Sequence, residues 1–180
     1  LIYEGEAMGS KIKTEERRTA HKFAQTTFMN DAPMMGIVAK GDELYMKQGG
    51  NKMPMPAEMA SDLKSAMGIF PEHGIAASSL AKLAGTENID GKSAYKIEVP
   101  GTSLKATYFY DVESGLKVKE AQVINIGGQT QNQETTLKDY TEVDGILFPS
   151  IKSTMMGPQQ VESKLLEAVV NKNVTDADFE

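Results

Sequence analysis

The sequence predicts a mainly β protein with α-helix (α+β), built as a curved antiparallel meander of about nine to eleven strands with one helical insertion. Short runs of β-forming residues alternate with turn signals about every 8–12 residues, a spacing typical of antiparallel sandwiches and barrels. Successive hairpins make a meander, and a meander of this length tends to curl or close. Between Pro56 and Phe70 the apolar period changes from that of a strand to that of a helix.

The strands before the insertion are expected in the first 50 residues. A hairpin is predicted around Gly41-Asp42, because glycine supplies the positive φ of a tight turn at no steric cost. The highly charged stretch Lys11–Arg18 is expected to form an exposed edge or a turn. The expected strands are Leu1–Met8, His21–Met29, Ile37–Lys40 and Leu44–Met46.

A helical insertion is expected over about residues 56–84. Met59, Leu63, Met67 and Phe70 lie at positions i, i+4, i+8 and i+11, which places them on one face of an amphipathic helix. Pro56 suits the first turn, where its missing N–H costs nothing. Gly68 and Pro71 mark the end of this helix. A second, shorter helix is expected from Ile75 to Ala84.

After the insertion the β pattern returns and continues to the end of the chain. Turn signals at Asn88–Gly91, Asp111–Gly115 and Glu142–Gly145 separate pairs of strands into hairpins. The tail at Thr175–Phe179 is expected to open a final turn or helix, with its aspartates at the positive N-terminal end. The expected strands are Leu83–Glu87, Ser93–Val99, Leu104–Tyr110, Leu116–Ile126, Gln131–Tyr140, Ile146–Ser153 and Gln159–Val170.

Length and composition bound the classes of function. A chain of 180 residues favours one domain spanning residues 1–180, and a net charge of −6 argues against a nucleic-acid binder. The absence of cysteine excludes disulfides, thiol catalysis and thiolate zinc sites. With only His21 and His73 and no nucleophile or phosphate-binding motif, we expect neither an enzyme nor a metal or cofactor site. No apolar run approaches the roughly 20 residues of a membrane-spanning helix.

Two clusters of side chains admit two interpretations each. The basic cluster Lys11, Lys13, Arg17, Arg18 and Lys22 also contains Glu15 and Glu16, which favours a solvated face over a surface for anionic headgroups. Methionine is unusually frequent, at 11 residues, and is flexible enough to accept varied apolar partners. The methionines of the central region either line an apolar ligand cavity or fill gaps in an ordinary core. The candidate ligand-binding residues are Met34, Met35, Met53, Met55, Met59, Leu63, Met67 and Phe70.

The carboxyl half carries an ordered series of turn-and-strand motifs. The series begins with Asn88-Ile89-Asp90-Gly91-Lys92-Ser93-Ala94-Tyr95, followed by Tyr108-Phe109-Tyr110-Asp111 and Ser114-Gly115-Leu116. It ends with the run from Asp139 to Pro149, then Val170-Asn171 and Asp178-Phe179. This series resembles the outer-membrane lipoprotein-sorting (LolA/LolB-like) family, in the form found in envelope proteins of Bacteroidetes-type bacteria. The resemblance covers residues 85–180 well and residues 1–84 by element order.

The resemblance implies an unclosed antiparallel β-barrel wrapped around helices, with an apolar cavity between them. It implies a non-catalytic periplasmic or cell-surface domain that binds the acyl chain of a lipid or lipoprotein, and it transfers no catalytic residue. In this family such a domain can also follow an insulinase-like zinc peptidase in one chain. The alternative is therefore an accessory protein-docking module that is part of a larger envelope protein. Because the chain begins Leu1-Ile2-Tyr3, we expect it to be a mature form or a fragment.

Overall fold

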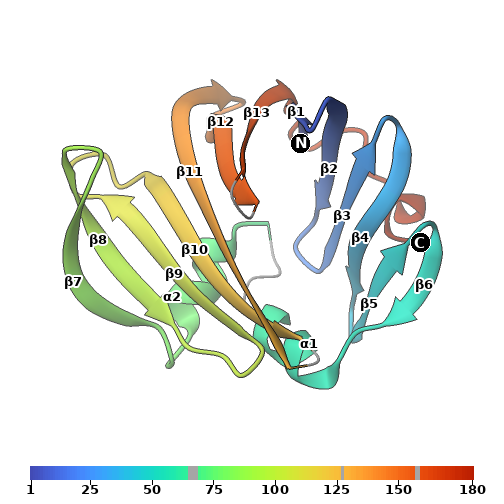
Figure 1. The fold of residues 1–180 in the computed structure, drawn as a ribbon, viewed down its shortest axis with the longest axis horizontal. Coiled ribbons are helices and arrows are strands. Elements are labelled where there is room, and N and C mark those ends of the chain that lie inside the picture. The colour runs from blue at the N-terminus through green and yellow to red at the C-terminus, as the bar shows by residue number, and fades with distance from the viewer. Residues whose placement is uncertain (65–68, 127, 157–158) are drawn as a thin grey trace.

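The computed structural model describes residues 1–64, 69–126, 128–156 and 159–180. Within these described residues, thirteen strands, two α-helices and a C-terminal 3₁₀ helix follow one another, and Figure 1 shows their arrangement. The elements are β1 Ile2–Ala7, β2 Ser10–Arg18, β3 Lys22–Met29, β4 Ala32–Lys40, β5 Glu43–Gln48, β6 Asn51–Pro54, α1 Ala57–Lys64, α2 Pro71–Ala77, β7 Lys82–Ile89, β8 Lys92–Val99, β9 Leu104–Asp111, β10 Lys117–Ile126, β11 Gln129–Val143, β12 Ile146–Met156, β13 Gln159–Glu167 and η1 Asp176–Phe179.

All thirteen strands belong to one antiparallel sheet, in the order β6-β5-β4-β3-β2-β1-β13-β12-β11-β10-β9-β8-β7. Every neighbour in this order is also a neighbour in sequence except β1 and β13, which join the first six strands to the last seven. At this seam Tyr3 lies opposite Leu165 and Gly5 opposite Ser163. The sheet curls strongly but stays open, with β6 and β7 as its two edges (Figure 1).

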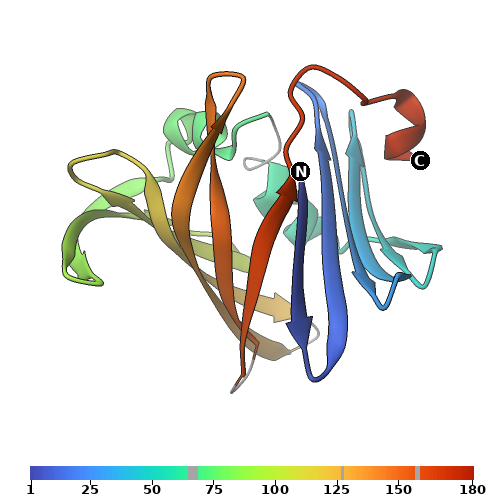
Figure 2. The same cartoon turned by 90° about the horizontal axis from the view of Figure 1, so that it is seen from above.

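The two helices occupy the concave side of the sheet. Because β6 and β7 are opposite edges, the chain between them must cross the open side of the curl, and α1 and α2 lie on this crossing (Figure 2). Ile75 of α2 packs against Ala106 and Tyr108 of β9, and all three side chains are buried. The insertion therefore covers part of the concave face and leaves the rest available to line a cavity.

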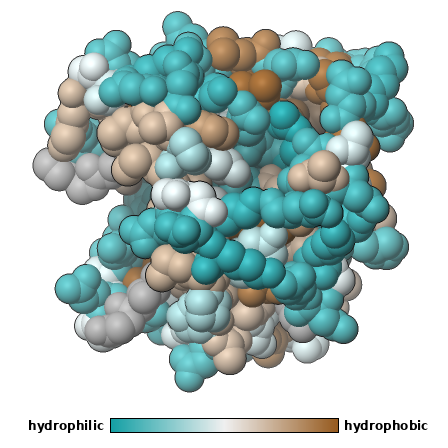
Figure 3. All heavy atoms as spheres, turned by 90° about the vertical axis from the view of Figure 1, so that its right-hand side faces the viewer, coloured by the Kyte–Doolittle hydropathy of each residue, from teal (hydrophilic) through white to brown (hydrophobic). Residues whose placement is uncertain are grey.

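A second cluster holds the end of the chain on the convex side. Phe179 in η1 is only 1% exposed and packs against Ala24, Val38 and Tyr45 of β3, β4 and β5. The segment after β13 reaches this position by passing over the end of the neighbouring strands (Figure 2). Figure 3 looks onto the side where β4, β5 and β6 lie and shows a mostly hydrophilic face with apolar residues in separate patches.

The strand count is higher than the nine to eleven expected from the sequence. The charged stretch around Lys11–Arg18 forms β2, a strand paired on both sides, rather than an exposed edge or a turn. The second addition is β6, where Asn51–Pro54 pairs with β5 beyond the turn at Gly49-Gly50. The expected mainly β, curved and open antiparallel architecture is confirmed.

The helical insertion is also divided differently from the expectation. The described part of the first helix is Ala57–Lys64, while Phe70 has extended backbone angles (φ −121°, ψ 115°) and caps α2. Phe70 precedes Pro71, whose ring disfavours the helical conformation for the residue before it. The second helix begins at Pro71, where proline suits the first turn, and ends at Ala77 rather than Ala84.

Candidate functional site

A cavity of about 990 Å³ lies between the concave face of the sheet and the helical insertion. Strands β1–β4 and β9–β13 form its wall, residues 63 and 69–72 cover it from the insertion, and residues 169–174 border it after β13. Its volume is at the upper end of the roughly 300–1,000 Å³ of typical small-molecule sites. Apolar and aromatic lining residues include Phe23, Ile37, Leu63, Phe70, Leu137 and Phe148.

The cavity is not uniformly apolar, because a basic residue of β10 forms an ion-pair cluster in its wall. Lys117 Nζ lies 3.1 Å from Glu120 Oε2 and 3.5 Å from Glu72 Oε1 in the first turn of α2. Burial works to lower the pKa of Lys117, but Glu120 and Glu72 outweigh it, so this pKa lies above its usual value. The cluster therefore stays charged and ties α2 to the sheet.

Four tyrosines face this cluster or lie beside it. The hydroxyl of Tyr140 donates a 2.6 Å hydrogen bond to the carbonyl oxygen of Lys117, and Tyr110 donates a 3.5 Å hydrogen bond to Glu72 Oε1. Burial raises the pKa of Tyr140 to about 12, and also raises the pKa values of Tyr3, Tyr108 and Tyr110. These phenols are neutral hydrogen-bonding groups at ordinary pH.

A second group of charges lines the cavity from β2 and β12. Arg18 Nε lies 2.6 Å from Glu16 Oε1, and the guanidinium also lies over the ring of Phe23. Burial works to raise the pKa of Glu16, but Arg18 and Lys152 overcome this effect and hold it below its usual value. The Lys152 ammonium lies 3.8 Å from the ring centroid of Tyr3, whose hydroxyl donates to the carbonyl oxygen of Pro149. Burial lowers the pKa of Lys152, against the opposing effect of Glu16.

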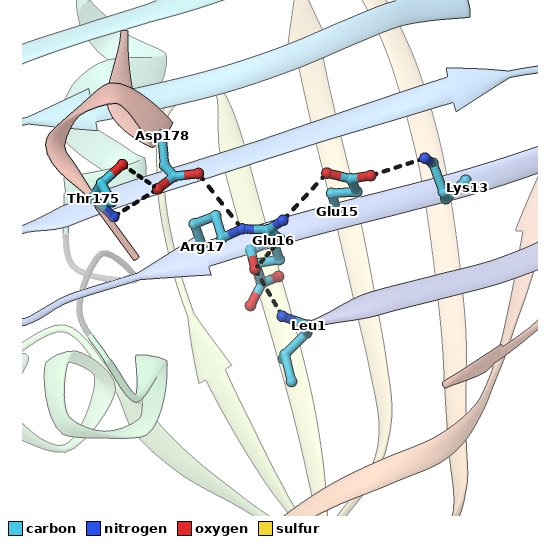
Figure 4. A network of polar contacts seen from close by, with 7 residues as sticks. All are labelled: Leu1, Lys13, Glu15, Glu16, Arg17, Thr175 and Asp178. Carbon is cyan, nitrogen blue, oxygen red and sulfur yellow. Dashed lines mark hydrogen bonds and ion pairs between the residues drawn. The ribbon is translucent and has the colours of Figure 1, made fainter. Parts of the chain in front are cut away.

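On the other face of β2, a chain of ion pairs fastens the end of the protein (Figure 4). Glu15 lies between Lys13 and Arg17, at 2.9 and 3.4 Å, and Arg17 Nε lies 3.8 Å from Asp178 Oδ1. Asp178 also accepts hydrogen bonds from the backbone N–H and hydroxyl of Thr175, which complete a capping box for η1. Successive residues of a strand face opposite sides, so the carboxylate of Glu16 lines the cavity while Arg17 forms the ion pair with Asp178 of η1.

The structure places the candidate ligand-binding residues in three environments. Leu63 and Phe70 line the cavity. Met55 and Met59 are buried, at 8% and 7% exposure. Met34 and Met35 are exposed near the start of β4, Met53 is exposed in β6, and Met67 lies outside the described residues. The ligand-binding role of these eight residues stays a prediction.

Sequence reasoning missed the polar part of the cavity. Glu16 and Arg18 were in a cluster expected to be a solvated face, and Lys117, Glu120 and Lys152 carried no motif. They come together only through the pairing of strands distant in sequence, such as β1 with β13. In the part of the chain that the structure describes, no group of three or more His, Cys, Asp or Glu residues is arranged to hold a metal ion. Neither described helix is long and apolar enough to cross a membrane.

Comparison with known proteins gives a likeness of fold. No family model and no curated protein matches this chain. Among solved structures, it is similar to a LolA superfamily protein from Nitrosomonas europaea, with a TM-score of 0.57 at 11% identity over 99% of this chain and 87% of that one. A DUF1329 family protein from Desulfovibrio piger gives a TM-score of 0.58 at 13% identity, with 99% and 87% of the chains covered.

A third similar structure is a putative outer membrane lipoprotein-sorting protein domain from Vibrio parahaemolyticus, with a TM-score of 0.58 at 11% identity over 99% of this chain and 86% of that one. All three likenesses extend over almost the whole chain. The chain therefore shares the open, curved β fold of LolA-superfamily and lipoprotein-sorting structures. This agrees with the fold that the motifs of its carboxyl half imply.

Proposed function

We propose that this protein is a non-catalytic binding domain of the cell envelope that holds an acyl chain of a lipid or lipoprotein inside its cavity. The observation that carries the proposal is the cavity of about 990 Å³ between the concave sheet and the helical insertion. Its wall combines aliphatic and aromatic side chains from both halves of the sheet. Each CH₂ group that moves from water into such surroundings contributes about 0.8 kcal/mol, so a long chain gains substantial affinity.

The helical insertion supplies the cover that such a ligand needs. Leu63 and Phe70 face the cavity from the insertion, while Ile37 and Leu137 line it from β4 and β11. An acyl chain between these two layers contacts apolar groups from several sides, which is how most of its surface leaves water. A loosely covered site of this kind suits a carrier that must also release its ligand.

The location we propose is the periplasm or the cell surface. The support is the resemblance of the carboxyl half to lipoprotein-sorting proteins, together with the likeness to a solved domain of that description. A docking module on a larger envelope protein, such as an insulinase-like zinc peptidase of Bacteroidetes-type bacteria, is the alternative from the same resemblance. A docking module of this kind would not need a ligand in the cavity.

The test is direct identification of a bound lipid. The protein is expressed with an envelope-targeting signal, purified without detergent, extracted with organic solvent, and the extract is analysed by mass spectrometry against the protein concentration. We expect an acyl lipid in a ratio near one per chain. A protein that carries no lipid, and takes none up from vesicles after purification, overturns the proposal and favours the docking module.

A further inference from the structure

The interior charges of the cavity are paired unequally. Lys117 is matched by two carboxylates, Glu120 at 3.1 Å and Glu72 at 3.5 Å. Arg18 is matched by Glu16 at 2.6 Å. These contacts engage the carboxylates of Glu16, Glu72 and Glu120 with two basic side chains. Lys152 also lines the cavity; its ammonium lies over the ring of Tyr3, and it interacts with Glu16 and Glu120 through space without a recorded ion pair among the described residues.

The ammonium of Lys152 also opens into the cavity. Among the described residues, every buried side-chain nitrogen or oxygen has a hydrogen-bond partner, yet no hydrogen bond or ion pair joins Lys152 to any of them. Its ammonium is therefore not sealed in the protein but reaches the open space that Lys152 lines. An ammonium carries three N–H donors and no acceptor, so the donors that are not directed at the Tyr3 ring are available to a ligand in the cavity.

We infer that Lys152 is the headgroup site of the cavity and that the natural ligand is an anionic amphiphile, an acyl chain that ends in a carboxylate or a phosphate. The inference rests on the proposed function and adds the class of ligand to it. An anion beside Lys152 receives charge-assisted hydrogen bonds in a place shielded from bulk water, where such bonds are strongest. Repulsion from Glu16 and Glu120 is limited, because Arg18 and Lys117 already compensate them.

The position of Lys152 in the sheet suits this role. It lies on β12, opposite Leu137 of β11 on one side and Ser163 of β13 on the other. Leu137 lines the same cavity, and Phe148 does so further along β12. A headgroup at Lys152 thus has apolar wall directly beside it for the first part of its chain.

The test compares ligands that differ only at the headgroup. Delipidated protein is titrated with a long-chain fatty acid, an alkyl phosphate and a fatty alcohol of matched chain length, below their micelle concentrations. One charge-assisted hydrogen bond predicts that the acid or the phosphate binds about tenfold or more tightly than the alcohol. A preference for the acid alone identifies a carboxylate ligand, and a preference for the phosphate alone identifies a phospholipid-type headgroup.

Variants then assign the preference to one side chain. Lys152→Met keeps the length and removes the charge, so we expect it to abolish the preference for the anion while affinity for the alcohol is kept. Lys152→Arg keeps the charge and retains most of the preference. The control is Lys164→Met on β13, an exposed lysine next to Ser163 on the opposite face of the sheet, which leaves all three affinities unchanged.

The titrations distinguish failure of the headgroup site from failure of the proposed acyl binding. Equal binding of the acid, the phosphate and the alcohol to the unaltered protein overturns the headgroup site and leaves acyl binding intact. Absence of binding by all three ligands overturns the proposed function, and the headgroup site with it. If Lys152→Met does not fold, Lys152→Gln takes its place, and an anion preference that persists in the neutral variant overturns the assignment to Lys152.

Discussion

The carboxylate of Asp62 in α1 accepts a 2.7 Å hydrogen bond from the backbone N–H of Ser103, in the loop between β8 and β9. The same oxygen, Oδ2, accepts a second hydrogen bond, of 2.9 Å, from the N–H of Leu104. Two successive backbone donors are thus satisfied by one helical side chain. Since α1 also carries Leu63, this contact fixes the cover of the cavity to the sheet.

We predict that Asp62→Ala loosens α1 and lowers stability by about 1–3 kcal/mol, because two backbone N–H groups lose a charged acceptor next to the buried Ser103. Hydrogen exchange of α1 amides and denaturant unfolding measure the two effects. Ser61→Ala, at an exposed neighbouring position in α1, is the control. Unchanged exchange in α1 would show that the helix is held by other contacts.

The cavity assignment predicts that Leu63→Glu weakens acyl binding by tenfold or more, because a charged carboxylate then stands in the space for the chain. Leu63 is half-buried, so the protein should remain folded. Leu166→Glu on β13, where the leucine is 59% exposed, is the matched control and should bind normally. Titration with a fluorescent fatty acid measures both variants; equal affinities would contradict the assignment.

The C-terminal 3₁₀ helix is predicted to be part of the stable fold. Phe179→Ala removes a ring that is 1% exposed among Ala24, Val38 and Tyr45, and should cost about 3 kcal/mol in the free energy of unfolding. Val174→Ala, at a position 38% exposed in the preceding segment, should cost little. Urea unfolding curves of both variants measure the change in the free energy of unfolding. If Phe179→Ala is as stable as the unaltered protein, η1 does not pack on the sheet in solution.

The cavity tyrosines predict a loss of stability in alkali. Their pKa values are raised in the folded state, to about 12 for Tyr140, while an unfolded tyrosine ionises near 10. The folded protein therefore holds protons that the unfolded chain loses, so stability is complete below pH 10 and falls as the pH rises toward 12. Denaturant unfolding across this range measures the slope. Tyr140→Phe should reduce the slope, and a slope that does not change would contradict the burial of this phenol.

The sequence was sufficient for the class of fold but not for two of its strands. β2 alternates Glu16 and Arg18 on the cavity face with Glu15 and Arg17 on the other face, so both faces are charged and no apolar alternation indicates a strand. β6 is a short edge strand that contains Pro54, a residue tolerated only where no ladder hydrogen bond is needed. Both strands form because they pair with neighbouring strands, and neither has the apolar alternation that would predict it from the sequence.

The site was less predictable because its members come from many strands. The helical period placed Leu63 and Phe70 on one face of a helix; Leu63 lines the cavity from α1, whereas Phe70 lines it from extended backbone before Pro71. Lys117 of β10 and Lys152 of β12 line the same cavity because the sheet is curved. No short sequence motif indicates this curvature. Methionine frequency was an ambiguous signal, since Met34 and Met35 are exposed at one end of β4 while Met59 is buried.

The central claim is that the acyl chain lies inside the barrel, and intermolecular NOEs between a bound fatty acid and labelled methyl groups test it most directly. Ile37 and Val38 are adjacent in β4 but face opposite sides, Ile37 toward the cavity and Val38 toward Phe179. We predict NOEs from the acyl chain to the methyl groups of Ile37 and Leu137 and none to Val38. NOEs to exposed methyl groups alone, such as those of Met34 and Met35, would place the ligand outside and contradict the account.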